Sequence, residues 1–334
     1  MKLPATTTEV AIQPANWQMN LHTKVITMGS CFAEVLGQQL SDHKFEVMNN
    51  PLATIFNPLT ISKILNQAVG GNISLSPLFI ENLDGIWLHH DFHSSFWQTR
   101  RELLESHIKN KLAQVRAFLR EADLLVITLG TAFAYRHKAT NQLVGNCHKV
   151  PADRFVRELL HPDQISNALE DTIFQLLTYN RNLKILVTVS PVRHTRDTLS
   201  LNQVSKSTLR LVCHRLTEKF KHVTYFPGYE LMIDELRDYR YYKEDLIHPN
   251  RMAEDYIFHV FVRHFVEEST QKFIEEWQSV RHMMDHKPRH GFTESYRKML
   301  LAVDKKLVEL CKQVDVTLER IEVARRLEEF SDKT

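Results

Sequence analysis

Glycine and cysteine are both scarce in this chain. Glycine supplies 9 of the 334 residues, well below the usual share of about 7%, so the chain has few flexible hinges and its composition suits a helix-rich protein. The four cysteines, at positions 31, 147, 213 and 311, are widely spaced and form no CxxC pair. This spacing argues against both a disulfide framework and a zinc knuckle.

Long apolar runs and an excess of one charge are absent as well. No stretch of the sequence approaches the roughly 20 apolar residues of a membrane span, and the first twenty residues lack the continuous apolar core of a signal peptide. The 42 basic and 40 acidic residues leave a net charge of +2, which gives no electrostatic footprint for nucleic acid or a membrane surface. We therefore expect a cytoplasmic enzyme with neither of these partners.

What the chain does contain is an alternation of short apolar runs and amphipathic segments. This order favours a parallel sheet with crossover helices, because strands buried on both faces are short and continuously apolar. We expect strands at 24–28, 45–48, 124–129, 184–190 and 223–226, and helices near 31–41, 59–68, 98–121, 152–177, 201–220 and 249–268. The length fits one α/β domain over 1–268 and a helical extension over 269–334.

The extension follows a segment with the proline and glycine of a linker, Met283 to Glu294. From Tyr296 the pattern predicts one helix that runs almost to the end. Its apolar positions step by three and four, as in a coiled-coil heptad broken by one threonine: Leu300, Val303, Leu307, Leu310, Val314, Thr317, Ile321 and Ala324. Such a seam packs back on the α/β domain, makes a homo-oligomer contact, or forms a lid over the site.

Ser30 follows the first apolar run, at the point where a strand would end on Gly29 and a helix would begin. This places its side chain at the carboxyl edge of the sheet, where open α/β sheets bind ligands. The helix start would direct free N–H groups toward charge that develops near the Ser30 oxygen. The alternative is that Ser30 only caps the helix.

Asp245 and His248, near the end of the α/β unit, are three residues apart and precede Pro249. At this spacing one turn of chain brings the carboxylate to one imidazole nitrogen and leaves the other free to take a proton from a hydroxyl. Ser30, His248 and Asp245 thus have the residue types of a nucleophile, a base and an orienting acid. The alternative is a helix-capping aspartate beside a surface histidine.

These residues lie in a longer pattern that resembles the GSCFA family, within the SGNH/GDSL-like hydrolase superfamily. Gly29 to Ala33 spell the family's name, and the likeness runs from about residue 23 to about residue 265. Further similar stretches are NPLATIFNP from Asn50, LLVITLGTAFAY from Leu124, NCHK from Asn146, SPVRH from Ser190, NQVSKSTLR from Asn202, YFPGYE from Tyr225 and DLIHPN from Asp245. The resemblance implies a three-layer α/β/α sandwich with a mainly parallel, flavodoxin-like sheet, and a serine–histidine pair for ester or acyl chemistry.

The chain departs from the superfamily where the oxyanion is held. Typical members carry a glycine after the second strand and an Asn-Asp pair after the third, whereas this chain has Ala53 and then Gly130 and Thr131. We expect the backbone N–H groups of Ser30 and Ala53 to serve, since alanine keeps the amide. The missing side-chain donor is then Asn146, on a hairpin with its tip near 139–141, or else Asn146 is a loop amide that satisfies nearby backbone.

Other residues are expected around the substrate. Asn57 lies in the NPLATIFNP stretch, and His93 resembles a family position that lines the pocket. His148 would contact a polar end of the substrate, and Arg193 with its neighbour His194 would pair with an acid group. Lys206 and Arg210, in contrast, are expected on the solvated face of a helix.

A competing interpretation rests on HHDFH, residues 89–93. If this segment is a strand, His89, Asp91 and His93 share one face and His90 lies on the other, an arrangement that binds zinc or iron in some proteins. The spacing is not a strong metal signature, and we expect neither a metal nor another cofactor.

The resemblance therefore predicts a serine hydrolase of the SGNH type that acts on an ester, an O-acyl or O-acetyl group of a small molecule or glycan. Two alternatives stay open. An O-acyltransferase uses the same residues and differs only in excluding water. A noncatalytic carbohydrate- or acyl-binding protein keeps the cleft without a working base.

Overall fold

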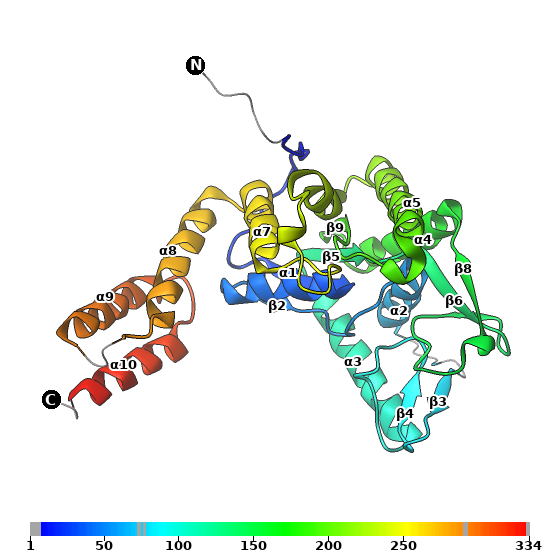
Figure 1. The fold of residues 1–334 in the computed structure, drawn as a ribbon, viewed down its shortest axis with the longest axis horizontal. Coiled ribbons are helices and arrows are strands. Elements are labelled where there is room, and N and C mark those ends of the chain that lie inside the picture. Colours follow the sequence, from blue (N-terminus) through cyan, green and yellow to red (C-terminus); the bar gives the residue numbers. More distant parts are fainter. Residues whose placement is uncertain (1–7, 72–74, 76–77, 290–292, 332–334) are drawn as a thin grey trace.

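A five-stranded parallel sheet forms the centre of the protein (Figure 1). The structure is a computed structural model that describes residues 8–71, 75, 78–289 and 293–331. The strands are β1 (Lys24–Gly29), β2 (Glu46–Met48), β5 (Leu124–Leu129), β9 (Lys184–Val189) and β10 (Val223–Phe226), in the order β10-β9-β5-β1-β2. All neighbouring pairs are parallel. The predicted parallel sheet is confirmed, and its strands begin and end within a residue or so of the expected positions.

Helices cover both faces of this sheet. They are α1 (Cys31–Asp42), α2 (Pro58–Gly70), α3 (Arg101–Glu121), α4 (Pro162–Tyr179), α5 (Thr198–Lys219) and α7 (Arg251–Phe265). Side chains alternate along each strand, so that Leu125 packs with α2 to α5 in one core while Leu124 packs with α1 and α7 in the other. The three-layer α/β/α architecture is therefore confirmed.

Two small sheets lie beside the main one, β3 (Phe79–Glu81) with β4 (Trp87–His89), and β7 (Gln142–Val144), β6 (Phe133–His137) and β8 (Phe155–Leu159). The hairpin predicted around 139–141 is present between β6 and β7. The prediction of one long helix over 152–177 is wrong. Residues 155–159 pair with β6 instead, and α4 begins only at Pro162, which fits the first turn of a helix.

The C-terminal extension consists of α8 (Glu268–Asp285), α9 (Glu294–Leu310) and α10 (Thr317–Ser331). The prediction of a single helix from Tyr296 is wrong, because the chain turns after Leu310 and a second helix begins at Thr317. At this start, Asp315 accepts a hydrogen bond from the backbone amide of Thr317 at 2.9 Å. The heptad seam is accordingly divided. Leu300 is buried, whereas Ile321 is 60% exposed. The glycine of the expected linker lies outside the described residues.

Helix α8 joins the extension to the α/β domain. Trp277 is 1% exposed, and its indole donates to the backbone oxygen of Asp42 at the end of α1, at 2.8 Å. Helix α9 packs against α8, and α10 packs against α9, while Arg326 of α10 donates to the backbone oxygen of Met284 in α8 at 2.6 Å. The three helices extend from α7 away from the sheet (Figure 1). In the described part of the chain no helix has the length and apolar character needed to cross a bilayer. The boundary at residue 268 stays a prediction.

Candidate functional site

Ser30 lies at the carboxyl end of β1, as the sequence predicted. Gly29 has a φ of +128°, and a Cβ on it would be 2.1 Å from the backbone oxygen of Thr128, so no other residue fits there. Ser30 itself is 1% exposed, and its hydroxyl accepts a hydrogen bond from the Phe32 amide at 3.3 Å. In this structure Ser30 is therefore the N-cap of α1.

Asp245 and His248 form the expected pair in one turn of chain. The imidazole Nδ1 of His248 is 2.7 Å from one carboxylate oxygen of Asp245, and the other oxygen accepts the amides of Ile247 and His248 at 2.8 and 3.0 Å. These bonds, the one from the His248 amide first, hold the pKa of Asp245 well below its usual range. An ionised carboxylate only accepts, so Nδ1 donates and Nε2 carries the lone pair, which has no hydrogen-bond partner among the described residues and can take a proton.

His248 and the first turn of α1 line the same cavity. Within the described residues no hydrogen bond joins the Ser30 hydroxyl to the His248 imidazole. Instead His248 and Cys31, the residue after the serine, line one cavity of about 370 Å³, together with the apolar Val35 and Val192. Catalytic hydrogen bonds are often long in unliganded sites and tighten with substrate.

Backbone groups expected to hold an oxyanion already have acceptors. The amide of Ser30 donates to the oxygen of Thr128 at 3.1 Å, and that of Ala53, which has a φ of 56°, donates to the oxygen of Asn50 at 2.8 Å. The amides of Gly130 and Thr131 both donate to the oxygen of Phe56, at 2.9 and 3.1 Å. At the helix start, the Cys31 amide has no acceptor among the described residues. No sequence pattern indicated that the Cys31 amide would lack an acceptor while the amides of Ser30 and Ala53 have one.

Asn146 and His148 hold the hairpin onto a neighbouring turn. The amide of Asn146 donates to the backbone oxygen of His90 at 2.7 Å, and its side-chain oxygen accepts from the His148 amide at 2.9 Å. The His148 imidazole contacts the backbone oxygen of His89 at 2.9 Å, and burial lowers its pKa to about 4. These contacts match the alternative in which Asn146 satisfies nearby backbone. No hydrogen bond within the described residues connects it to Ser30.

The remaining expected site residues also have partners in the protein. Asn57 caps α2, where its side-chain oxygen accepts the Thr60 amide at 2.9 Å. The Thr131 hydroxyl is 3.0 Å from that of Ser205, and the His93 imidazole is 3.1 Å from the Ser95 hydroxyl. None of these contacts reaches Ser30 or His248.

The HHDFH segment is not the strand that the metal interpretation needed. Strand β4 ends at His89, so the faces expected along the segment do not form. Asp91 pairs with the Lys63 ammonium at 2.5 Å, and the ring of His90 stacks against that of His137. In the described ranges no three His, Cys, Asp or Glu residues are grouped so that they could hold a metal ion. The condition on which the metal interpretation depended, a strand over residues 89–93, is therefore not met.

Lys206 is the residue most misjudged from sequence. Rather than facing solvent, it is fully buried, and its ammonium donates to the backbone oxygens of Gly130 and Ser190 at 2.8 and 2.7 Å. Burial lowers its pKa to about 7. The helical period does contain a signal, because position 206 falls on the same stripe of α5 as the buried Leu209 and Cys213.

His194, expected beside Arg193 on the ligand side, lies at the same sheet edge. Its ring packs edge-on against Phe56, with centroids 5.4 Å apart. Burial, together with the charge of Lys206, lowers its pKa to about 3, so it is neutral at physiological pH. Arg210 remains half-exposed and pairs with Glu230 at 2.9 Å.

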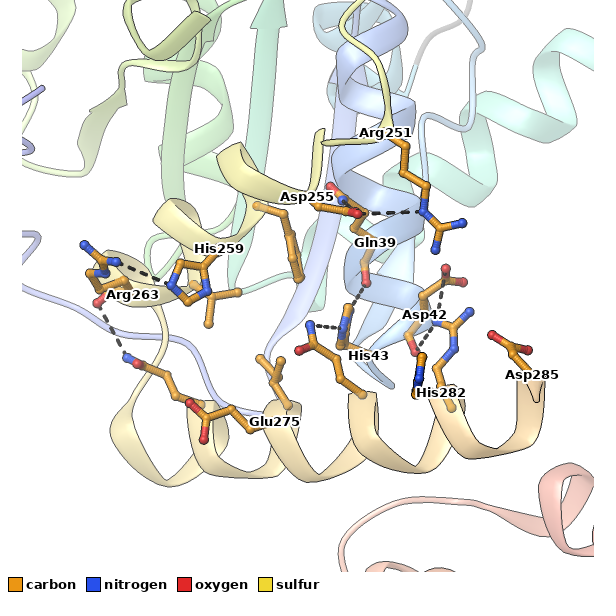
Figure 2. Close-up of a pocket in the computed structure, with 16 residues that line it drawn as sticks. Gln39, Asp42, His43, Arg251, Asp255, His259, Arg263, Glu275, His282 and Asp285 are labelled. Atoms are coloured by element: carbon orange, nitrogen blue, oxygen red, sulfur yellow. Dashed lines mark hydrogen bonds and ion pairs between the residues drawn. The ribbon is translucent and has the colours of Figure 1, made fainter. Parts of the chain in front are cut away.

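A second cavity, of about 530 Å³, lies between α1, α7 and α8 (Figure 2). His43 at its centre accepts from Gln278 at 3.1 Å and contacts the backbone oxygen of Gln39 at 2.6 Å. Its polar side chains mostly pair with one another, as Arg251 does with Asp255 at 3.7 Å. Neither Ser30 nor His248 lines this cavity.

Comparison with known proteins identifies the family pattern along most of the chain. The model described as "GSCFA family" matches residues 24–261, and that described as "GSCFA domain protein, C-terminal domain" matches residues 277–329. No curated protein matches.

Three solved structures are distantly similar. They are a variant of an acetyl-xylooligosaccharide esterase from Geobacillus Stearmophilus (10% identity, TM-score 0.36, 75% of this chain and 98% of that chain), a family 3 carbohydrate esterase from Clostridium thermocellum (11%, 0.32, 76% and 98%), and a family two carbohydrate esterase from the same organism in complex with cellohexaose (12%, 0.31, 73% and 64%).

Proposed function

The chain belongs to the GSCFA family, and from this premise we propose that it is a serine hydrolase of the SGNH type that cleaves an O-acyl or O-acetyl ester. The observation that carries the proposal is the pair of Asp245 and His248, whose side-chain atoms lie 2.7 Å apart. The His248 member of this pair lines the same cavity as Cys31, the residue after Ser30. An ionised aspartate fixes the imidazole with its basic nitrogen unblocked, which is the arrangement that general-base catalysis requires.

In the proposed reaction, substrate binding draws the Ser30 hydroxyl from the Phe32 amide toward His248. Nε2 of His248 takes the hydroxyl proton while the oxygen attacks the ester carbonyl, and the protonated imidazole then gives that proton to the leaving alcohol. Water, deprotonated by the same nitrogen, then attacks the acyl carbonyl; the bond to the Ser30 oxygen breaks, this oxygen takes the proton from the imidazolium, and the acid is released. With an acceptor alcohol in place of water, the same steps give acyl transfer.

The oxyanion needs donors where its charge develops, and each is worth roughly 3 to 4 kcal/mol. The Cys31 amide, at the start of α1 and without an acceptor among the described residues, is the donor that the resting structure leaves available. The amides of Ser30 and Ala53 become oxyanion donors if they break their hydrogen bonds to the oxygens of Thr128 and Asn50. Asn146 remains a proposal for a side-chain donor.

The apolar walls of the cavity beside His248 favour a short acyl chain as the group that it receives. Val35, Val192 and Pro249 contribute these walls, and an ion pair between Lys243 and Glu254, at 3.2 Å, lies beside them. The cavity volume is about 370 Å³. We therefore expect faster turnover of esters with short acyl chains than of esters with long ones when the two are measured side by side.

A fluorophosphonate, which phosphonylates only activated serines, tests the proposal. We expect an adduct on Ser30, mapped by mass spectrometry, that is lost in Ser30→Ala and in His248→Ala because the hydroxyl then lacks its base. Ser95→Ala is the matched control, since Ser95 is also 3.1 Å from an imidazole, that of His93, and should keep the label.

A noncatalytic acyl- or carbohydrate-binding protein is the second candidate. It is favoured by the N-cap role of Ser30 and by the absence, within the described chain, of a hydrogen bond from its hydroxyl to His248. Two results together would decide for this candidate. The wild type takes no fluorophosphonate label, and its turnover of p-nitrophenyl acetate is either absent or unchanged in Ser30→Ala.

A further inference from the structure

Arg193 connects the end of the central sheet to the turn that carries the histidine. It follows β9 by four residues, and its amide donates to the backbone oxygen of Ile247 at 3.1 Å. Its guanidinium donates to the oxygen of Leu246 at 3.3 Å. The two residues between Asp245 and His248 are therefore both hydrogen-bonded to this one arginine.

The turn is a segment that needs such support. Leu246 has a φ of 56°, a left-handed conformation that a leucine rarely adopts, and its side chain is 49% exposed, so it has little packing of its own. Inside the turn, the Leu246 amide donates to Lys243 at 2.9 Å and the Lys243 amide to His248 at 2.8 Å. In the described chain, Arg193 alone donates to the oxygens of Leu246 and Ile247.

The guanidinium is itself held in place by aromatic rings. Its central carbon lies 3.8 Å from the centre of the Tyr242 ring and 5.3 Å from that of Tyr239. A planar guanidinium stacks on a ring and donates from its edge at the same time, which a lysine ammonium does not do. Among the described residues Arg193 has no carboxylate partner, and its guanidinium donates to the histidine turn and to the Tyr242 side chain.

We propose that Arg193 is a positioning residue that holds the Asp245 to His248 turn against the end of β9, so that the basic nitrogen of His248 keeps its direction. This replaces the expectation that Arg193 binds an acid group of the substrate. The effect of Arg193 on the reaction rate rests on the proposed hydrolase function. Its effect on the orientation of the His248 ring does not.

Three variants test this proposal. In Arg193→Met we expect kcat for p-nitrophenyl acetate to fall about a hundredfold, the effect of a small misplacement of a catalytic group, with KM changed less than about twofold. Arg193→Lys keeps the charge but loses the stacked fork, and should fall between wild type and Arg193→Met. Arg196→Met, a neighbouring exposed arginine on the same loop, is the matched control and should leave both constants unchanged.

A second measurement does not depend on turnover. In protein labelled with ¹⁵N-histidine, the ring shifts of His248, assigned from the spectrum of His248→Ala, should show the Nδ1–H tautomer in the wild type. Arg193→Met should show a mixture of tautomers, because the Asp245 contact is no longer held, while circular dichroism shows the fold intact.

Two results overturn the proposal. One is an Arg193→Met protein with wild-type kcat and wild-type His248 shifts. The other is a rise in KM that is confined to esters bearing a carboxylate, which returns Arg193 to substrate binding. If the wild type hydrolyses no ester and takes no fluorophosphonate label, the proposed function fails, and the His248 shifts still decide whether Arg193 positions the turn.

Discussion

Gly29 has a backbone conformation that L-residues avoid, and there is no space for a side chain beside it. We expect Gly29→Ala to lower the free energy of unfolding by about 3 kcal/mol or more, because both strain and a contact with the oxygen of Thr128 must be relieved. Urea denaturation measures this change. Gly70→Ala is the control, since a Cβ there would meet nothing within 4 Å, and it should raise stability by up to about 1 kcal/mol. Equal effects of the two changes would contradict the argument.

Asp245 is predicted to act through its negative charge. Its pKa lies well below the usual range because amides and the imidazole donate to it, so the carboxylate stays ionised as the pH falls toward that range. We expect Asp245→Asn to lower kcat about 10³- to 10⁴-fold, by the same factor at about pH 6 and about pH 8, where the group is ionised throughout.

Asp238→Asn is the matched control for this change. Asp238 also accepts bonds, from Arg240, that lower its pKa, but it lies outside the histidine turn. A kcat loss in Asp238→Asn as large as that in Asp245→Asn would mean that the effect is a general loss of structure.

At the scale of elements, Lys206 joins α5 to the ends of β5 and β9 through two backbone oxygens. Its pKa is lowered from 10.5 to about 7, so between these values the folded state is neutral while the unfolded state is protonated. The unfolded state then binds more protons, and stability rises with pH over this window, by up to about 1.4 kcal/mol per unit. Below it both states are charged and the contribution is constant.

We therefore expect the stability of the wild type relative to Lys206→Met to increase from pH 7 to pH 10 in urea titrations, since methionine has no proton to lose. At neutral pH, Lys206→Met should itself cost about 1 to 3 kcal/mol for each carbonyl left without a donor. Lys219→Met, on the exposed part of the same helix, should change stability by less than about 0.5 kcal/mol at neutral pH. A relative stability that does not vary with pH would contradict the buried ammonium.

At the scale of the whole molecule, the extension and the α/β domain share one core. Trp277 of α8 is packed in the same cluster as Phe261 of α7 and Leu40 of α1. We expect Trp277→Ala to cost about 3 to 5 kcal/mol and unfolding to remain a single calorimetric transition, because the shared core couples the two parts. Phe174→Ala, at a position that is 69% exposed, is the control. Separate transitions for α8–α10 and the sheet would contradict a shared core.

Some features of the site depend on residues close together in the sequence, and others depend on distant ones. The pairing of Asp245 with His248 was predictable because the two residues are only three apart in the chain, although the turn between them is also hydrogen-bonded to the distant Arg193. The positions of Ser30 and of the Gly130–Thr131 pair at one sheet edge were also predictable, since parallel strands end on the same side. Whether an amide there is free depends on carbonyls from other strands and loops, such as those of Thr128 and Phe56, which no local pattern contains.

By itself the sequence determined the parallel sheet, its flanking helices and the histidine turn, because apolar periodicity and short spacings act over a few residues. Only the tertiary structure decided that residues 155–159 pair as a strand with β6 and that Lys206 is buried between strand ends. It also decided that Arg193 holds the turn of His248. In each case the deciding partner is distant in sequence, and a burial or a hydrogen bond with such a partner overrides the local preference of the segment.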